Sequence, residues 1–274
     1  RDLSEVQFWK QSDHLVQAPK VWETLREQHS DFTCAKLFWW YNMYSSADWS
    51  FTPRPMYPAD GRKVFDIHTH PCDIRADIKR DLGEFPFPGF WGPAAGVDTP
   101  QGSADCVSRW IAESAKWIEQ KHSPTLSLVY LPHLDYSLQR FGPEAAAIAT
   151  DLRKIDDIVG GLLEYYERNG VQVVLLSEYG ITEVDRPIHL NRIFRKQGWL
   201  AVKEELGLEM LDAGDSRAFA VADHQVAHIY LNRNEDSSFR DEVKKLLEKT
   251  EGVQSVLDAA AKKERGVNHE RSGD

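Results

Sequence analysis

The stretch "TLSLVYL", residues 125–131, indicates the fold class. It is a short apolar run of the kind that forms buried parallel strands, and "TCAKLFWW" (33–40) and "VQVVLLS" (171–177) have the same character. Between the second and third runs, residues 143–169 carry apolar side chains at helical spacing, and Gly170 is a suitable helix stop. A strand, helix, strand unit requires parallel pairing of its strands. The sequence therefore predicts an α/β fold with a mostly parallel sheet and helices on both faces.

The rest of the chain continues this pattern, with one exception. Residues 41–106 are rich in proline, glycine and aromatic residues and show little periodicity. We expect them to form an ordered excursion or cap over one edge of the sheet, within a single domain that spans residues 1–274. Further helices are expected within residues 189–200 and 239–252, and further strands at 217–222 and 226–231.

Composition and charge limit the classes of function. The 274 residues, 42% of them hydrophobic, are enough for a sizeable core. A net charge of −10 without a basic cluster excludes a nucleic acid polymer as a partner, whereas a small phosphate ester is compatible because a metal can supply positive charge. Cys34, Cys72 and Cys106 form no paired motif, which favours a reducing, cytoplasmic location. No apolar run is long enough to predict a membrane span.

Polar side chains follow two of the predicted strands. Asp135 comes shortly after residues 125–131, and Glu178 and Tyr179 come directly after residues 171–177. Because ligands of open parallel sheets bind beyond the carboxyl ends of the strands, we expect Asp135 and Glu178 to converge at one edge. A divalent metal between two such carboxylates would relieve their repulsion. An acid in this position is also a common turn former or helix cap, and the pattern alone leaves both interpretations open.

Several segments resemble the type I phosphodiesterase and nucleotide pyrophosphatase family of the alkaline phosphatase superfamily. "LDYSLQRFGP" (134–143) resembles its D-x-x-x-H-x-x-G-P segment, and "VVLLSEYGITEV" (173–184) resembles its S-D-H-G-M segment. "RPIHLNRIFRKQGWL" is similar to the helix that follows, and "ADHQVAHIYL" and "RSGD" are similar to the phosphonoacetate hydrolase branch. The resemblance covers residues 125–274 in order and residues 1–124 loosely. It implies an alkaline phosphatase-like fold and hydrolysis of phosphodiester or pyrophosphate bonds.

The resemblance also implies a two-metal site, usually of zinc, with a threonine or serine nucleophile between the ions. Asp135 matches a ligand of one metal, and Glu178 stands where the family has an aspartate ligand of the other. Gln139 and Tyr179 both replace histidines, which lowers zinc affinity because glutamine is a weak neutral ligand and a phenol normally keeps its proton. A preference for manganese or magnesium, histidines from elsewhere, or a loss of catalysis that leaves a pseudo-enzyme or binding protein would each account for the replacements.

Substrate binding is assigned to residues further along the chain. His224 and His228 lie in a turn that enters a strand, so each would supply a single contact, and a structural Asp223–His224 pair is the alternative. Arg271 could bind a phosphate. In the family the nucleophile lies near the amino terminus, and residues 1–32 resemble what comes after it. We therefore expect a longer protein with the nucleophile upstream of residue 1, or a companion chain or second copy that supplies the missing segments.

Two further hypotheses come from residues 38–70. In "FDIHTHP", His68 and His70 alternate as in the metal sites of amidohydrolase barrels, although the other histidines do not fall at expected strand ends. A surface "HTH" without a role is the alternative. The aromatic stretch of residues 38–58 could bind a planar or apolar group next to the site, or could form the edge of the core.

Overall fold

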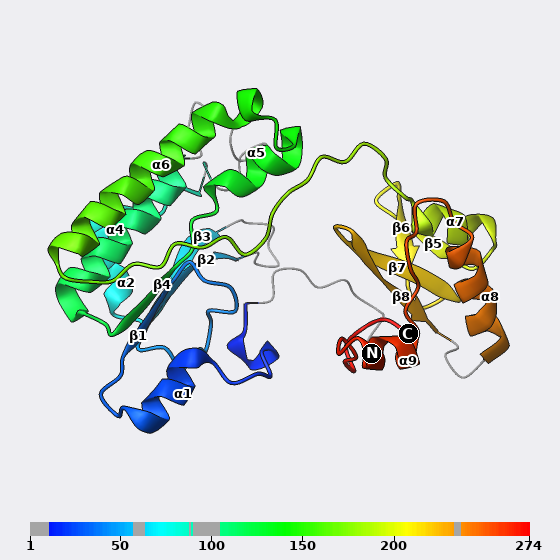
Figure 1. Cartoon of the computed structure of the whole chain (residues 1–274), viewed down its shortest axis with the longest axis horizontal. Coiled ribbons are helices and arrows are strands. Elements are labelled where there is room, and N and C mark those ends of the chain that lie inside the picture. Colours follow the sequence, from blue (N-terminus) through cyan, green and yellow to red (C-terminus); the bar gives the residue numbers. More distant parts are fainter. Residues whose placement is uncertain (1–10, 57–63, 88, 90–104, 233–236) are drawn as a thin grey trace. The chain divides into compact units, whose positions relative to one another are not determined.

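The chain forms two compact units, one of residues 9–184 and one that contains residues 185–274, and each is described by itself. The computed structural model describes residues 11–56, 64–87, 89, 105–232 and 237–274. Figure 1 shows both units, with the sheet of the first carrying labels β1 to β4. The single domain over residues 1–274 stays a prediction.

The first unit is built on a four-stranded sheet with the order β3-β2-β1-β4. The central strand β1 (Cys34–Leu37) pairs in parallel with both β2 (Trp49–Met56) and β4 (Leu126–Val129). β3 (Val64–His70) pairs antiparallel with β2. The sheet is therefore mostly parallel, which confirms the predicted fold class and the strands expected within residues 33–40 and 125–131.

Helices cover the sheet of the first unit, and its core lies beneath the long helices α4 and α6 (Figure 1). Leu37 and Phe51 of the sheet are fully buried there, together with Ile111 and Ile118 of α4. On α1, Trp22 packs in a smaller cluster with Cys34 of β1. In this unit the structure gives bounds for η1 (Asp13–Leu15), α1 (Val21–Gln28), α2 (Ile74–Leu82), α4 (Asp105–His122), α5 (His133–Phe141) and α6 (Ala145–Arg168).

The predicted excursion of residues 41–106 is instead part of the sheet, wherever the structure describes it. It contains β2 and β3, which extend the sheet beyond β1, and helix α2. Two prolines in β2, Pro53 and Pro55, explain why the sequence did not indicate a strand, since proline lacks the N–H that a ladder uses. Parts of the range, residues 57–63, 88 and 90–104, lie outside the described residues.

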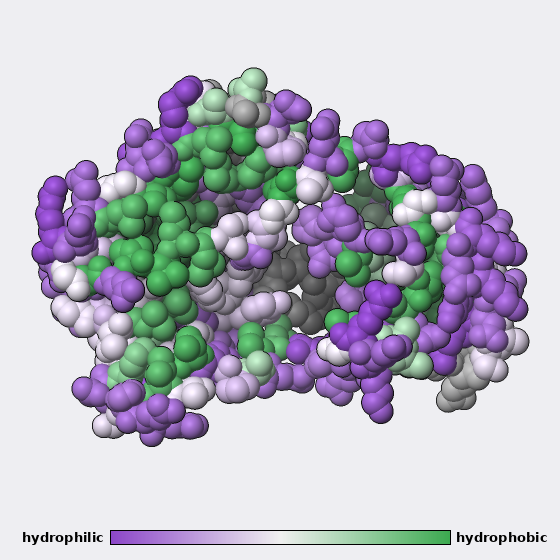
Figure 2. Space-filling model, in the orientation of Figure 1, coloured by the Kyte–Doolittle hydropathy of each residue, from purple (hydrophilic) through white to green (hydrophobic). Residues whose placement is uncertain are grey.

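The predicted strand at residues 171–177 is wrong. The chain leaves α6 through a hydrogen bond from Val171 N to Tyr166 O and then continues without regular secondary structure to α7. Val174 is 75% exposed, and Leu175 and Leu176 are 70% exposed. A strand needs a neighbour for its backbone N–H and C=O groups, and no described segment pairs with this one. Figure 2 shows that apolar residues gather on the side of the first unit that is turned toward the viewer.

The second unit contains two antiparallel hairpins and three helices among its described residues. β5 pairs with β6, and β7 pairs with β8. Phe194, Trp199 and Phe239 form the centre of its core. The helices and strands expected from the sequence in this part are all present. Their bounds are α7 (Leu190–Lys196), β5 (Ala201–Glu205), β6 (Leu208–Asp212), β7 (Ala218–Asp223), β8 (Val226–Leu231), α8 (Ser237–Glu248) and α9 (Ala259–Glu264).

Candidate active site

Asp135 lies in the first turn of helix α5, and therefore neither at the end of a strand nor in a loop. The chain leaves β4 at Val129 and begins α5 at His133, so only three residues separate the strand from the helix. A carboxylate in the first turn is favoured by the helix dipole. Gly142, with a φ of 75°, ends the helix, which is typical of glycine because other residues disfavour this conformation.

Asp135 is the centre of a small hydrogen-bonded cluster. Gln139 lies one helical turn further on the same face of α5, and its Nε2 donates to Asp135 Oδ1 over 2.7 Å. The hydroxyl of Tyr179 donates to the same oxygen. Two neutral donors thus orient the carboxylate of Asp135 through one of its oxygens. The structure thus brings together three of the four residues that were predicted as metal ligands.

The Tyr179 phenol is held in its protonated form. Partial burial raises its pKa, the hydrogen bond to Asp135 raises it further, and the charge of Asp135 and, to a lesser extent, of Glu178 acts in the same direction. Because the phenol uses its proton to bond Asp135, it does not offer a phenolate to a metal in this arrangement.

Glu178 does not join the cluster. Its side chain is exposed, and no hydrogen bond or ion pair to it occurs among the described residues. The described part of the chain contains no group of three or more histidine, cysteine, aspartate or glutamate side chains arranged to hold a metal ion. Around Asp135, Gln139 and Tyr179 both direct hydrogens at the carboxylate, so this set as arranged does not fit a zinc centre. The four-residue metal site stays a prediction.

The predicted substrate-binding residues all belong to the second unit. His224 Nδ1 lies 2.7 Å from Asp223 Oδ1 in the turn between β7 and β8, which is the structural pair expected as the alternative to a binding role. His228 Nδ1 accepts a hydrogen bond from Gly273 N over 3.2 Å. A Cβ on Gly273 would lie 2.6 Å from the backbone of Ile229, so only glycine fits there.

Arg271 lies in the same terminal segment as Gly273. Its backbone N donates to His269 Nδ1 over 3.1 Å. Three residues later the segment docks on strand β8, where Asp274 N donates to Ile229 O and Asp274 Oδ2 accepts from Leu231 N. The structure therefore places the "RSGD" segment beside His228, as a strand-edge contact within the second unit. A role of these residues in substrate binding stays a prediction.

The alternative metal pair, His68 and His70, lies within β3 and therefore on a regular strand, which the sequence did not indicate. Alternation along the strand puts the two rings on the same face. His68 is half-buried with the Tyr44 ring edge-on at 6.3 Å between centroids, and burial lowers its pKa. No third ligand completes a metal group with these histidines among the described residues.

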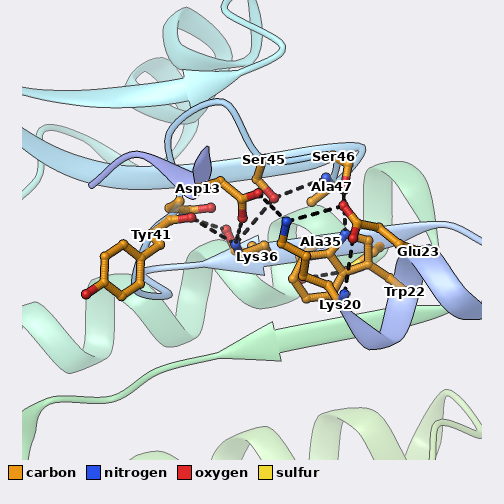
Figure 3. A network of polar contacts seen from close by, with 12 residues as sticks. Asp13, Lys20, Trp22, Glu23, Ala35, Lys36, Tyr41, Ser45, Ser46 and Ala47 are labelled. Atoms are coloured by element: carbon orange, nitrogen blue, oxygen red, sulfur yellow. Dashed lines mark hydrogen bonds and ion pairs between the residues drawn. The ribbon is translucent and has the colours of Figure 1, made fainter. Parts of the chain in front are cut away.

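A polar cluster around Lys36 was not predicted from the sequence. Lys36 is only 1% exposed, although its side chain is polar. Its Nζ donates to Tyr41 O over 3.1 Å and lies 3.4 Å from Asp13 Oδ1. Lys20 pairs with the same aspartate over 2.9 Å, and the Trp22 ring lies beneath Lys36 (Figure 3). Burial lowers the pKa of Lys36, and Asp13 opposes that change. The cluster holds the segments around residues 13–20 and 41–45 against β1. In the sequence, the single lysine inside the apolar run "TCAKLFWW" could have indicated such a buried polar contact.

Within the described residues, no helix has both the length and the apolar character that crossing a membrane would require.

Comparison with known proteins identifies the family. The sequence model of the family described as type I phosphodiesterase / nucleotide pyrophosphatase matches residues 1–274. An uncharacterized pyrophosphatase/phosphodiesterase of Schizosaccharomyces pombe is 29% identical over 87 residues, which are 29% of this chain and 18% of that protein. The match thus spans less than a fifth of the relative's length, and no solved structure matches the chain. With its full length matched by the family model, the chain belongs to the type I phosphodiesterase / nucleotide pyrophosphatase family.

Proposed function

We propose that this protein hydrolyses phosphate esters, at phosphodiester or pyrophosphate bonds, and that Asp135 is the principal carboxylate of its site. The family match over residues 1–274 supports the reaction class, and it is the observation that carries the proposal. The printed name of the fission yeast relative agrees with this class. The family gives no support to the amidohydrolase hypothesis for His68 and His70.

The hydrogen bonds of Asp135 support its role. Oδ1 receives both Gln139 Nε2 and the Tyr179 hydroxyl, whereas Oδ2 receives no hydrogen bond from the residues that the structure describes. The carboxylate is thus oriented through one oxygen and can use the other for a cation or for a proton of the substrate. A divalent metal, when bound, would neutralise phosphoryl charge and activate a hydroxyl. Asp135 and Glu178 are the carboxylates that this chain would contribute to it, and such oxygen ligands suit manganese or magnesium better than zinc.

The test compares Asp135→Ala and Glu178→Ala in the full-length protein. We expect both to lower the bound metal, measured by elemental analysis. Asp135→Ala should also lower kcat/KM for an aryl phosphodiester by at least ~10²-fold, because even the outer partners of metal ligands cost up to about that much when they are lost. Asp157→Ala, on an exposed position of α6, is the matched control and should change neither quantity. Unchanged metal content in both site variants would contradict the metal assignment.

A second candidate is a protein of the same family that binds phosphate esters without hydrolysing them. It is favoured by Gln139 and Tyr179, which both donate hydrogens to Asp135 where the family resemblance implies metal-binding histidines. The double variant Gln139→His and Tyr179→His separates the two candidates. If the wild-type protein binds no metal and the double variant gains at least ~10-fold in zinc affinity, the natural site is impaired. If the wild-type protein binds metal and the double variant gains nothing, the protein is a hydrolase with an altered ligand set.

A further inference from the structure

A buried polar cluster joins helix α5 to helix α6, on the opposite side of α5 from the candidate site. His133 and Ser137 of α5 are 2% and 3% exposed, and Asp151 of α6 is 9% exposed. The Ser137 hydroxyl donates to Asp151 Oδ2, and His133 Nε2 lies 3.7 Å from Asp151 Oδ1. One carboxylate of α6 therefore meets two side chains of α5.

Helix α5 thus has two polar faces with different neighbours. His133 and Ser137 are four residues apart and share the face that meets α6, and Asp135 and Gln139 are also four residues apart and share a face that meets Tyr179. The offset of two residues turns one face from the other by about 200° around the helix axis. Any rotation of α5 that moves one face therefore moves the other by the same angle.

The contact with Asp151 selects one rotational setting of α5. Among the described side chains of α5, those that are buried are polar, and Leu134 and Leu138 are only half-buried. Apolar contacts accept small rotations, whereas a buried carboxylate loses its stabilisation when its hydrogen-bond partner leaves. A step of one residue, about 100°, would take Ser137 away from Asp151 and leave the carboxylate without this donor.

We propose that Asp151, through Ser137 and His133, is a positioning residue that sets the direction of the Asp135 carboxylate. That this direction matters for catalysis rests on the proposed function. The positioning itself can be tested without any activity, because the hydrogen bond from Tyr179 to Asp135 depends on where the carboxylate points. Removal of the Asp151 carboxylate should therefore loosen a contact on the far side of α5, although Asp151 touches neither Asp135 nor Tyr179.

The experiment follows the Tyr179 phenol by NMR in the full-length protein with tyrosine labelled at ¹³Cζ. Tyr179→Phe assigns the signal, and Asp135→Ala gives its position without the hydrogen bond. In Asp151→Ala and in Ser137→Ala we expect the Tyr179 signal to move toward that position, while Asp157→Ala leaves it unchanged. Ser137→Thr, which keeps a hydroxyl, should hold the signal near its wild-type position.

The outcomes decide between positioning and mere stability. A Tyr179 signal that stays at its wild-type position in both Asp151→Ala and Ser137→Ala would overturn the proposal, as would a shift that appears equally at Tyr230 in the other unit. If Asp151→Ala does not fold, Ser137→Ala carries the test. In the active protein, Asp151→Ala should lower kcat by about 10-fold to 100-fold with a smaller change in KM. A shifted Tyr179 signal with no hydrolysis in any form would retain the positioning and reject the proposed function.

Discussion

Strand β4 and residues 171–177 have similar sequences and different structures. "LSLV" of β4 and "VQVVLLS" are both short apolar runs, and each precedes an acid of the predicted site. β4 pairs with β1 along its whole length. Residues 171–177 pair with no described strand, and their side chains are exposed. A short apolar run can therefore form a strand, but whether it does depends on a neighbouring strand that pairs with its backbone.

Because only one of the two runs is a paired strand, the site residues that follow them are also positioned differently. After β4 the chain enters α5 at once, which directs Asp135 and Gln139 to one face of a helix. After residue 177 the chain has no sheet to fix which side chain turns inward. Tyr179 reaches Asp135, and Glu178 remains exposed. Neighbouring side chains of an extended segment point to opposite sides, so only one of Glu178 and Tyr179 can face Asp135. The structure therefore pairs Asp135 with a phenol, where the sequence predicted a second acid.

Limited proteolysis should give the largest difference between the two runs. Thermolysin cuts before large apolar residues, and we expect cleavage at Leu175 or Leu176 long before cleavage at Leu126 or Leu128. A protease needs locally open backbone. Opening β4, a partly buried strand at the edge of the sheet, breaks its ladder with β1, so the ratio of rates should be roughly 10² or more. Mass spectrometry of the first fragments measures it. Comparable early cleavage in β4 would show that the sheet edge opens as readily as the unpaired run.

Aspartate substitutions test the same contrast by stability. Val129 of β4 is partly buried against the main core, and Val129→Asp should lower the free energy of unfolding by about 2 kcal/mol, because it places a carboxylate against apolar side chains. Val174→Asp, at a side chain that is 75% exposed, should change it by less than about 0.5 kcal/mol. Urea denaturation of each variant gives both values. Equal losses would mean that residues 171–177 are covered in the protein in solution.

Sequence reasoning succeeded where periodicity and pairing agree. The strands at residues 33–40 and 125–131 and the helix within 143–169 are present because each has an apolar face and a neighbour to receive it. It failed at β2, where Pro53 and Pro55 conceal a strand between two partners, and at residues 171–177. Local composition does not specify which neighbour a strand has.

At the candidate site, the spacing of residues in the sequence was informative, whereas the sequence did not indicate that the backbone around Asp135 is helical. Asp135 and Gln139, four positions apart, do lie together, but on a helix where the sequence indicates the end of a strand. The pairing of Tyr179 with Asp135 spans 44 positions of sequence, and no local pattern specifies it. Lys36 and Asp151 were missed because a buried charge is identified by its partners, and those partners are distant in sequence.

Apart from the exposed control positions, the smallest expected effect is at the hydrogen bond between Tyr179 and Asp135, which lie beyond the ends of the two runs. Tyr179→Phe removes the hydroxyl that bonds Asp135 and keeps the ring. The side chain is 45% exposed, so water replaces much of the lost interaction, and we expect a loss of about 0.5 to 1 kcal/mol in the free energy of unfolding at neutral pH. Glu178→Gln, next to it and outside the cluster, is the matched control and should have almost no effect.

The pH dependence of that loss identifies its cause. Burial, and then the bond to Asp135, raise the Tyr179 pKa in the folded protein, whereas an unfolded tyrosine titrates near about 10. Below about pH 10 both states keep the proton, and the bond contributes fully. Above it the unfolded chain releases the proton first, so the stability advantage of wild type over Tyr179→Phe should fall as the pH rises toward the folded-state pKa. Unfolding free energies of both proteins at pH 7, 9 and about 10.5 measure this change. A difference that stays constant over this range would contradict the hydrogen bond between Tyr179 and Asp135.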